Sequence, residues 1–264
     1  AVVMSFGGFS FLLIPGVRSW VGSALPTVLL GLAALTGVIA LGAAVLLRDP
    51  DDPAEPSGEA GASEAAANNR SNDDYTWRQT VRTWQFWLLY AVFVVVNGIG
   101  VMVIGKAVAY AGALELSAVV ATGSASLIAI ADAAGVFVGS AASDRFGRER
   151  TAGTALVLTG IGLAGAVGVG SAGRGQLFVA LIGVAAFFRS PAFAIFPVLV
   201  GEYYGERHSS TNYAALYTSK IWGAVLGGAV ASGAVVVIGW SPAFLLAAAI
   251  AVAGGVAMFG LRRP

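Results

Sequence analysis

The chain has 264 residues, of which 57% are hydrophobic and only 11% are charged, and its mean hydropathy is +0.81. Soluble domains carry about 25% charged residues, so this composition excludes a soluble globular protein and indicates a polytopic membrane protein. Because the sequence contains no Cys, disulfides and thiol chemistry are excluded as well. The apolar runs are long and continuous, which predicts membrane helices rather than the alternating strands of a membrane barrel.

The apolar runs predict eight crossings, since about 20 apolar residues span the hydrocarbon core. Residue 1 is Ala, and the first apolar run, 2–14, is short for a full crossing, so we expect an N-terminal portion to be missing. Two crossings precede residue 49 and six follow residue 78. The predicted ranges are 2–14, 21–47, 85–110, 118–142, 151–170, 176–200, 212–238 and 243–261.

The segment 49–78 divides the chain into three regions. Eight of the 14 acidic residues lie within 49–74, together with three Pro residues and many Ala, Gly, Ser and Asn residues. Such a composition cannot build a core and is typical of a flexible linker. We therefore predict two helices in 1–48, an acidic linker in 49–78 and a six-helix unit in 79–264.

Basic residues predict the orientation of this arrangement in the membrane. With the linker on the cytoplasmic side, ten arginines of the connecting segments fall inside and two, Arg18 and Arg174, fall outside. This asymmetry satisfies the positive-inside rule. It predicts an integral protein of the cell membrane whose linker and C-terminus are cytoplasmic.

A polar cluster joins the second and third crossings after the linker. Its core, Asp144-Arg145-Phe146-Gly147-Arg148, resembles the D-R-x-G-R loop of the major facilitator superfamily, which occupies the same place in each six-helix half. The resemblance implies an all-α helix bundle, with helices 5–12 of a 12-helix plan present and the first four absent. It also implies a gating role for Asp144, Arg145, Gly147 and Arg148; the alternative is an interfacial charge cluster that anchors two helices.

Three further segments resemble the oxalate:formate antiporter family within that superfamily. They are RTWQFWLLY (82–90) with GVMVIG (100–105), FAIFP (193–197) with EYYG (202–205), and NYAALYTSK (212–220). The family exchanges small carboxylates, held in its oxalate-carrying members by a lysine in helix eleven and an arginine in helix eight. Lys220 matches the lysine, whereas Val136 stands at the arginine position, so the resemblance implies small carboxylates more firmly than oxalate.

Lys220 is also singled out by the sequence alone, without the resemblance. Four charged residues lie inside the predicted crossings, and an intramembrane charge is expensive unless it faces a partner, a cavity or a substrate. Three of them are basic and one is acidic, which favours an anionic ligand; they are Lys106, Asp132, Arg189 and Lys220.

On a helix, Lys220 shares one stripe with Tyr213 and Tyr217. The hydroxyls of both tyrosines can donate to a carboxylate, and the alternative for each is packing between helices. For Lys220 the alternative is a structural ion pair with Asp132.

Arg189 is our candidate for the second carboxylate anchor, because a guanidinium suits bidentate binding. The alternative is an arginine bound to backbone carbonyls that Pro191 and Pro197 leave without partners. Asp132 is either a charge partner or the carrier of a coupling proton. Lys106 lies toward the outer end of its crossing, from which it can extend to the interface.

Two hypotheses follow from the sequence. The first is a secondary active transporter, an antiporter or symporter, for small mono- or dicarboxylates by alternating access. Its partners would be the carboxylate, the lipid bilayer, and the missing N-terminal helices or a second copy. The second is a truncated, non-transporting membrane protein that keeps the fold as a remnant, sensor or assembly partner. The sequence holds no convergent nucleophile and base, metal cluster or nucleotide-binding loop, so we expect no enzyme activity, cofactor, metal or nucleic-acid partner.

Overall fold

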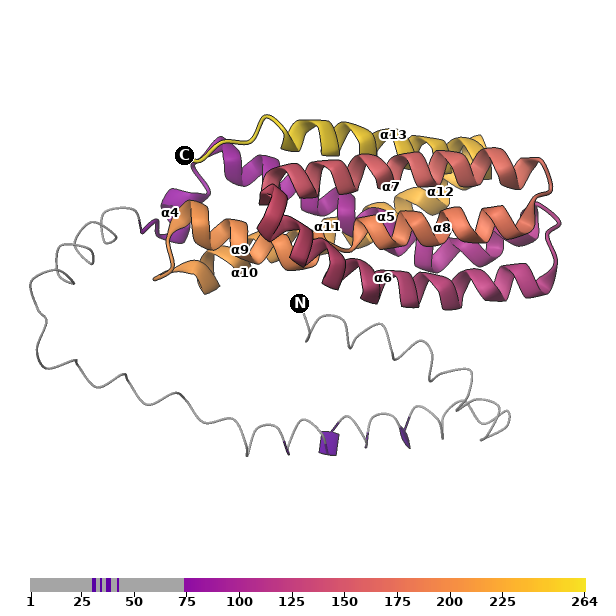
Figure 1. Cartoon of the computed structure of the whole chain (residues 1–264), viewed down its shortest axis with the longest axis horizontal. Coiled ribbons are helices and arrows are strands. Elements are labelled where there is room, and N and C mark those ends of the chain that lie inside the picture. The colour runs from indigo at the N-terminus through magenta and orange to yellow at the C-terminus, as the bar shows by residue number, and fades with distance from the viewer. Residues whose placement is uncertain (1–29, 32–33, 35–36, 39–41, 43–73) are drawn as a thin grey trace, which may run out of the picture. The chain divides into compact units, whose positions relative to one another are not determined.

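The computed structural model describes residues 74–264, together with the helical residues 30, 31, 34, 37, 38 and 42. Apart from those six positions, the predicted crossings 2–14 and 21–47 and the acidic segment 49–73 lie outside the described residues. Within 74–264 every regular element is a helix (Figure 1). The elements are α4 (Trp77–Thr80), α5 (Trp84–Ala113), α6 (Ala118–Phe146), α7 (Arg148–Ser171), α8 (Gly175–Arg189), α9 (Ala192–Tyr204), α10 (Ser209–Tyr217), α11 (Ser219–Val225), the π-helical turn η1 (Leu226–Val230), α12 (Ala231–Ile238) and α13 (Trp240–Met258).

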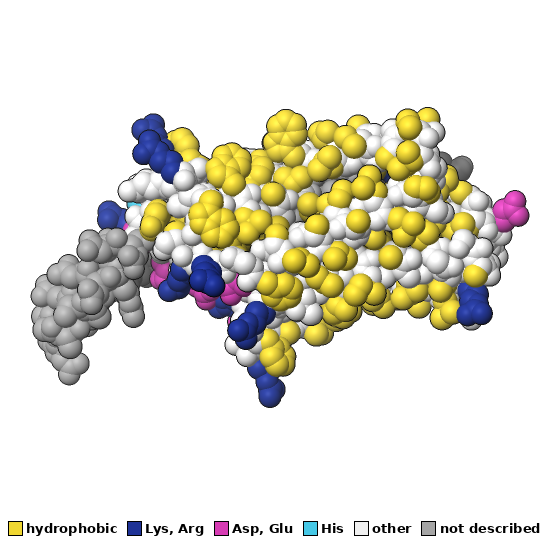
Figure 2. All heavy atoms as spheres, turned by 90° about the horizontal axis from the view of Figure 1, so that it is seen from above, with side chains coloured by type: hydrophobic (Ala, Val, Ile, Leu, Met, Phe, Trp, Pro, Cys, Tyr) yellow, Lys and Arg dark blue, Asp and Glu magenta, His cyan; other side chains and the backbone are white. Residues whose placement is uncertain are grey.

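These helices form six segments that are long and apolar enough to cross a membrane, as predicted for the region after the linker. Figure 2 shows hydrophobic side chains along the length of the visible face and charged side chains toward its ends. That distribution fits a bundle whose long axis crosses the hydrocarbon core. The six segments are Trp84–Ala113, Leu127–Phe146, Arg148–Ser171, Gly175–Tyr204, Ser209–Ile238 and Trp240–Met258.

Two of the crossings are built from broken helices. The fourth is divided at Ser190 and Pro191 into α8 and α9, and Pro197 lies within α9. The fifth contains α10, α11, η1 and α12 in succession. Proline removes a backbone donor, and a π-turn changes the hydrogen-bond spacing. Both crossings therefore have local irregularities close to the charged residues that the sequence singled out.

Small residues bring the helices of the bundle close together. α7 packs along both α8 and α13, and it lies between them in Figure 1. α11 packs on α5, where a Cβ added to Gly223 would come 2.5 Å from the Cβ of Asn97. Close backbone approach of this kind is the usual basis of packing between membrane helices.

The last residues of the predicted linker belong to the bundle. The Tyr75 amide donates to the Tyr204 carbonyl at 2.9 Å, and the Asn212 side chain donates to the Tyr75 carbonyl at 2.9 Å. The Tyr75 ring also meets the Tyr204 ring edge-on at 5.7 Å. These contacts fix the start of the six-helix unit against α9 and α10.

Candidate functional site

The three residues of the predicted stripe lie together. Lys220 Nζ donates to the Tyr217 hydroxyl at 2.5 Å and lies 4.1 Å from the centroid of the Tyr217 ring. The rings of Tyr213 and Tyr217 are 5.5 Å apart. The helix break at Thr218 separates α10 from α11, yet it preserves the alignment of the two tyrosines with the lysine.

Lys220 has no acidic partner within residues 74–264. The three ion pairs of this region are Arg148–Asp144, Arg148–Glu202 and Arg189–Asp132. Instead, the ammonium of Lys220 faces aromatic rings, with the Phe193 centroid 5.1 Å from Nζ. Cation–π contacts of this kind favour a positive charge without neutralising it. The positive charge of Lys220 is therefore available to an anion.

Tyr213 adds a buried polar group without a hydrogen-bond partner. Its hydroxyl is buried and has no hydrogen-bond partner, and the same is true of the Ser219 hydroxyl. A buried polar atom without a partner costs roughly 1–3 kcal/mol. An incoming acceptor that bonded to either hydroxyl would recover part of that cost.

Asp132 binds Arg189 rather than Lys220. Arg189 Nη2 lies 2.7 Å from Oδ1 and 2.6 Å from Oδ2 of Asp132, and the Ser190 hydroxyl donates to Oδ1 at 2.5 Å. The ion pair joins α6 to the end of α8, and the Arg189 side chain is only 5% exposed. The alternative pairing of Lys220 with Asp132 is thus not the arrangement in this structure.

A glycine and an aromatic ring surround the rest of the Arg189 guanidinium. A Cβ added to Gly100 would lie 2.7 Å from Nη1, so a larger residue on α5 at this position would require the guanidinium to shift. The Phe193 ring centroid is 5.4 Å from Arg189 Cζ and 5.1 Å from Lys220 Nζ. The two cationic groups therefore contact one ring and cannot be farther apart than the sum of these distances.

Sequence reasoning missed Phe193 and Ser190. Phe193 lies four residues after Arg189, a spacing that places two side chains on one helix face and was visible in the sequence. Ser190 follows Arg189 directly and gave no distinguishing signal. In the described part of the chain, no three His, Asp or Glu side chains come together as a metal ion would require.

The turn between α6 and α7 is shorter than the polar run 143–150 suggests. Asp144 and Arg145 belong to α6, Arg148 begins α7, and Gly147 alone separates the two helices with φ +90°. This backbone conformation is essentially restricted to glycine. The whole reversal therefore takes place at one residue.

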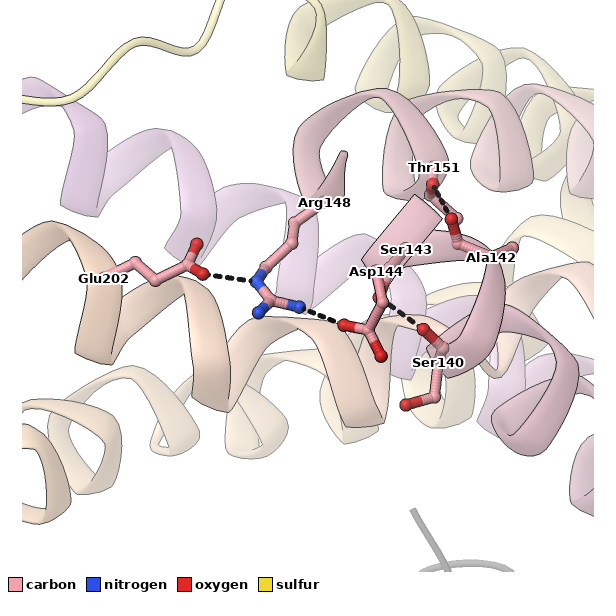
Figure 3. Close-up of polar contacts among 7 residues, drawn as sticks. All are labelled: Ser140, Ala142, Ser143, Asp144, Arg148, Thr151 and Glu202. Atoms are coloured by element: carbon pink, nitrogen blue, oxygen red, sulfur yellow. Dashed lines mark hydrogen bonds and ion pairs between the residues drawn. The ribbon is translucent and has the colours of Figure 1, made fainter. Parts of the chain in front are cut away.

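Arg148 connects this turn to α9. Its Nη1 donates to Asp144 Oδ1 at 2.8 Å, and its Nε donates to Glu202 Oε1 at 2.7 Å (Figure 3). Arg145 is not part of the cluster and lies over the Phe146 ring. We call Asp144, Arg148 and Glu202 the inter-helix charge cluster. The sequence indicated its first two members and missed Glu202, which lies 54 residues beyond Arg148.

A second contact lies beside the inter-helix charge cluster. The Tyr203 hydroxyl donates to Glu149 Oε1 at 2.7 Å. Glu149 follows Arg148 on α7, and Tyr203 follows Glu202 on α9. The start of α7 and the end of α9 are thus joined by two neighbouring polar contacts, Arg148 with Glu202 and Glu149 with Tyr203.

The described region is a bundle of six candidate membrane spans with broken helices beside intramembrane charges, an arrangement that many membrane transporters share. Residues 94–264 match the family model of the Major Facilitator Superfamily, and the chain belongs to that family.

Two curated proteins are similar to this chain. The oxalate:formate antiporter of Oxalobacter formigenes is 26% identical over 178 residues, which cover 67% of this chain and 42% of the antiporter. The uncharacterized MFS-type transporter YhjX of Escherichia coli (strain K12) is 30% identical over 152 residues, covering 57% of this chain and 37% of that protein. The chain thus spans less than half the length of the curated relatives that it matches.

Proposed function

We propose that the protein is a secondary active transporter of small organic anions, mono- or dicarboxylates of the oxalate and formate type, which works by alternating access. The observation that carries the proposal is Lys220, an intramembrane cation without an acidic partner among residues 74–264. Asp132, an acidic residue in the middle of α6, is already paired with Arg189. The positive charge at Lys220 therefore favours an anionic substrate. The name of one relative, an oxalate:formate antiporter, agrees with this substrate class.

In this proposal Lys220 supplies the charge and the tyrosines supply hydrogen bonds. The substrate carboxylate replaces the Tyr217 hydroxyl as the acceptor of the Lys220 bond, which is 2.5 Å long in this structure. The released Tyr217 hydroxyl then donates to the same carboxylate. The partnerless hydroxyl of Tyr213 lies one helical turn away and provides a further donor. Charge-assisted bonds of this type are about twice as strong as neutral ones.

Arg189 serves as the second anchor through the donors that Asp132 does not use. Asp132 uses only Nη2 of the guanidinium, and the guanidinium carries further N–H donors. A dicarboxylate held at Lys220 can extend across Phe193, which contacts both cations. In this role Asp132 is the charge partner that keeps Arg189 in place while the site is empty.

The inter-helix charge cluster acts as the gate of this cycle. Arg148 is bonded to Asp144 at the end of α6 and to Glu202 near the end of α9. A rigid-body movement of one helix against the others breaks these exposed bonds at small cost, since surface ion pairs contribute about 0–1 kcal/mol. The cluster can therefore favour one conformation without locking it. The distribution of arginines supports our proposal that this end of the bundle faces the cytoplasm at the cell membrane.

Uptake of labelled oxalate and formate into vesicles that bear the protein tests the proposal. Lys220→Ala is expected to abolish uptake, and Lys220→Arg to retain part of it because the charge remains. Lys106→Gln is the matched control, since Lys106 is also an intramembrane lysine but is bonded to Ser232 at 2.7 Å and does not belong to the stripe. Equal uptake by the wild type and Lys220→Ala would remove Lys220 from the mechanism.

A binding measurement separates loss of the site from loss of transport. Formate and oxalate should raise the melting temperature of the detergent-purified wild type, because a ligand that binds only the folded state stabilises it. The same anions should leave Lys220→Ala unchanged. Stabilisation by an organic cation but by neither carboxylate would refute the assignment of an anionic substrate.

A further inference from the structure

A groove lies between α6, α7 and α8, apart from the Lys220 site. Its volume is about 420 Å³, and its walls are formed mainly by apolar side chains. Two of these, Val138 and Phe146 of α6, are 54% and 65% exposed. An adjacent face of α7 is closed, because Ala152 and Leu156 pack toward Arg189 around a void of only about 10 Å³. The groove is therefore an open surface feature beside a closely packed face of α7.

The polarity of the groove changes in steps along α7. Arg150, Thr154 and Leu158 all line it, and their spacing of four residues places them on one helix face. Arg150 is exposed and has no ion-pair partner among residues 74–264. From the α6–α7 turn toward the middle of the crossing, the face thus passes from cationic to hydroxylic to aliphatic.

This gradient matches one kind of molecule present in a bilayer. An anionic phospholipid has a phosphate at the depth of the headgroups and acyl chains that extend toward the bilayer centre. A guanidinium binds phosphate in a bidentate manner, and basic residues at the membrane surface favour anionic lipids by about 1 kcal/mol each. A small soluble anion would have no use for the apolar walls beyond Thr154.

We propose that this groove binds one anionic phospholipid, with the phosphate at Arg150 and an acyl chain along Ala142, Thr154 and Leu158. The lipid would lie in the leaflet on the side of the α6–α7 turn. It would cover the apolar walls of the groove that α6 and α7 contribute. The site does not depend on the transported substrate.

Native mass spectrometry of the delipidated, detergent-purified protein tests the proposal. The protein is titrated with phosphatidylglycerol and with phosphatidylcholine of the same acyl chains. We expect one phosphatidylglycerol to bind in preference to phosphatidylcholine. Arg150→Gln should weaken that binding about fivefold or more. Arg174→Gln, at the opposite end of the bundle, is the matched control and should bind phosphatidylglycerol as the wild type does. The melting temperature of each variant shows that it is folded.

A second variant tests the groove apart from its charge. Ala142→Phe keeps Arg150 and fills the groove with a ring, so it should also lose the preferred phosphatidylglycerol. Retention by Ala142→Phe together with loss by Arg150→Gln would show headgroup binding at the surface alone and would overturn the groove site. Equal binding by Arg150→Gln and the wild type, or displacement of the lipid by inorganic phosphate, would overturn the proposal as well.

Discussion

The buried pair of Arg189 and Asp132 predicts a strong, non-additive effect on stability. Arg189 is 5% exposed and its Nη2 lies within 2.7 Å of both Asp132 oxygens, while Ser190 donates to the same carboxylate. Asp132→Ala removes all these bonds and leaves a buried guanidinium without a counter-charge. Breaking a buried pair in this way costs about 3–5 kcal/mol. Arg189→Met leaves the carboxylate without its cation and should cost a similar amount.

The double variant Asp132→Ala/Arg189→Met should be much less destabilised than the sum of the single variants. With both charges gone, neither desolvation cost remains, and an apolar replacement of a buried pair is often near neutral. We expect the free energy of unfolding of the double variant to be at least about 2 kcal/mol higher than the sum of the two single losses predicts. This difference is within the range of coupling between residues in contact.

Tryptophan fluorescence during titration with a denaturing detergent measures these differences, since the chain has six Trp residues. Ser190→Ala is an intermediate case and should cost about 1.5–3 kcal/mol for one lost bond to a charged group. Strict additivity of Asp132→Ala and Arg189→Met would refute the reasoning, because it would mean that the two side chains do not stabilise each other.

Three further predictions concern the frame around the site. Gly147→Ala should lower the free energy of unfolding by about 1–3 kcal/mol, because the φ of Gly147 is +90°. At Gly168 an added Cβ meets no atom within 4 Å, so Gly168→Ala should stabilise α7 by about 0.5–1 kcal/mol in the same melting assay. Gly223→Ala places a Cβ too close to α5 and should cost about 1–3 kcal/mol; an unchanged melting temperature would contradict the close crossing. Glu202→Gln should leave the melting temperature nearly unchanged. It should raise the labelling rate of a Cys introduced at buried Ser219 by up to about fivefold, because the lost ion pair with Arg148 contributes at most about 1 kcal/mol. The absence of native Cys makes this label unique, and an unaltered rate would argue against gating by the charge cluster.

Membrane helices are readable from sequence because the bilayer leaves few alternatives. A backbone in hydrocarbon must satisfy its own hydrogen bonds, so each long apolar run after residue 78 becomes a helix. The predicted range 151–170 falls within α7, and 212–238 falls within the crossing of α10 to α12. The internal breaks were less accessible: Pro191 signalled one, whereas the π-turn η1 contains no residue that demands it.

Lys220 and its tyrosines were also within reach of the sequence, since helical periodicity alone places them on one face. The partner of Asp132 was not within reach of the sequence, because either Lys220 or Arg189 could supply the positive charge. The choice depends on the contact of α6 with α8 and α9, where Gly135 faces the Phe187 backbone and Gly139 faces Pro191. Glu202 likewise has no role until α9 is placed beside the α6–α7 turn.

Local chemistry along the chain determined the membrane class, the six apolar crossings of residues 79–264, the Gly147 turn and the lysine stripe, because each depends on near neighbours or on the bilayer itself. The tertiary structure decided which charges neutralise each other. Pairing across 57 residues between Asp132 and Arg189 requires α6 and α8 to approach closely, and that approach depends on side-chain packing over their whole length. Once this pair is formed, Lys220 remains as a cation beside Tyr217 and Phe193 with no acidic residue of the described region to neutralise it.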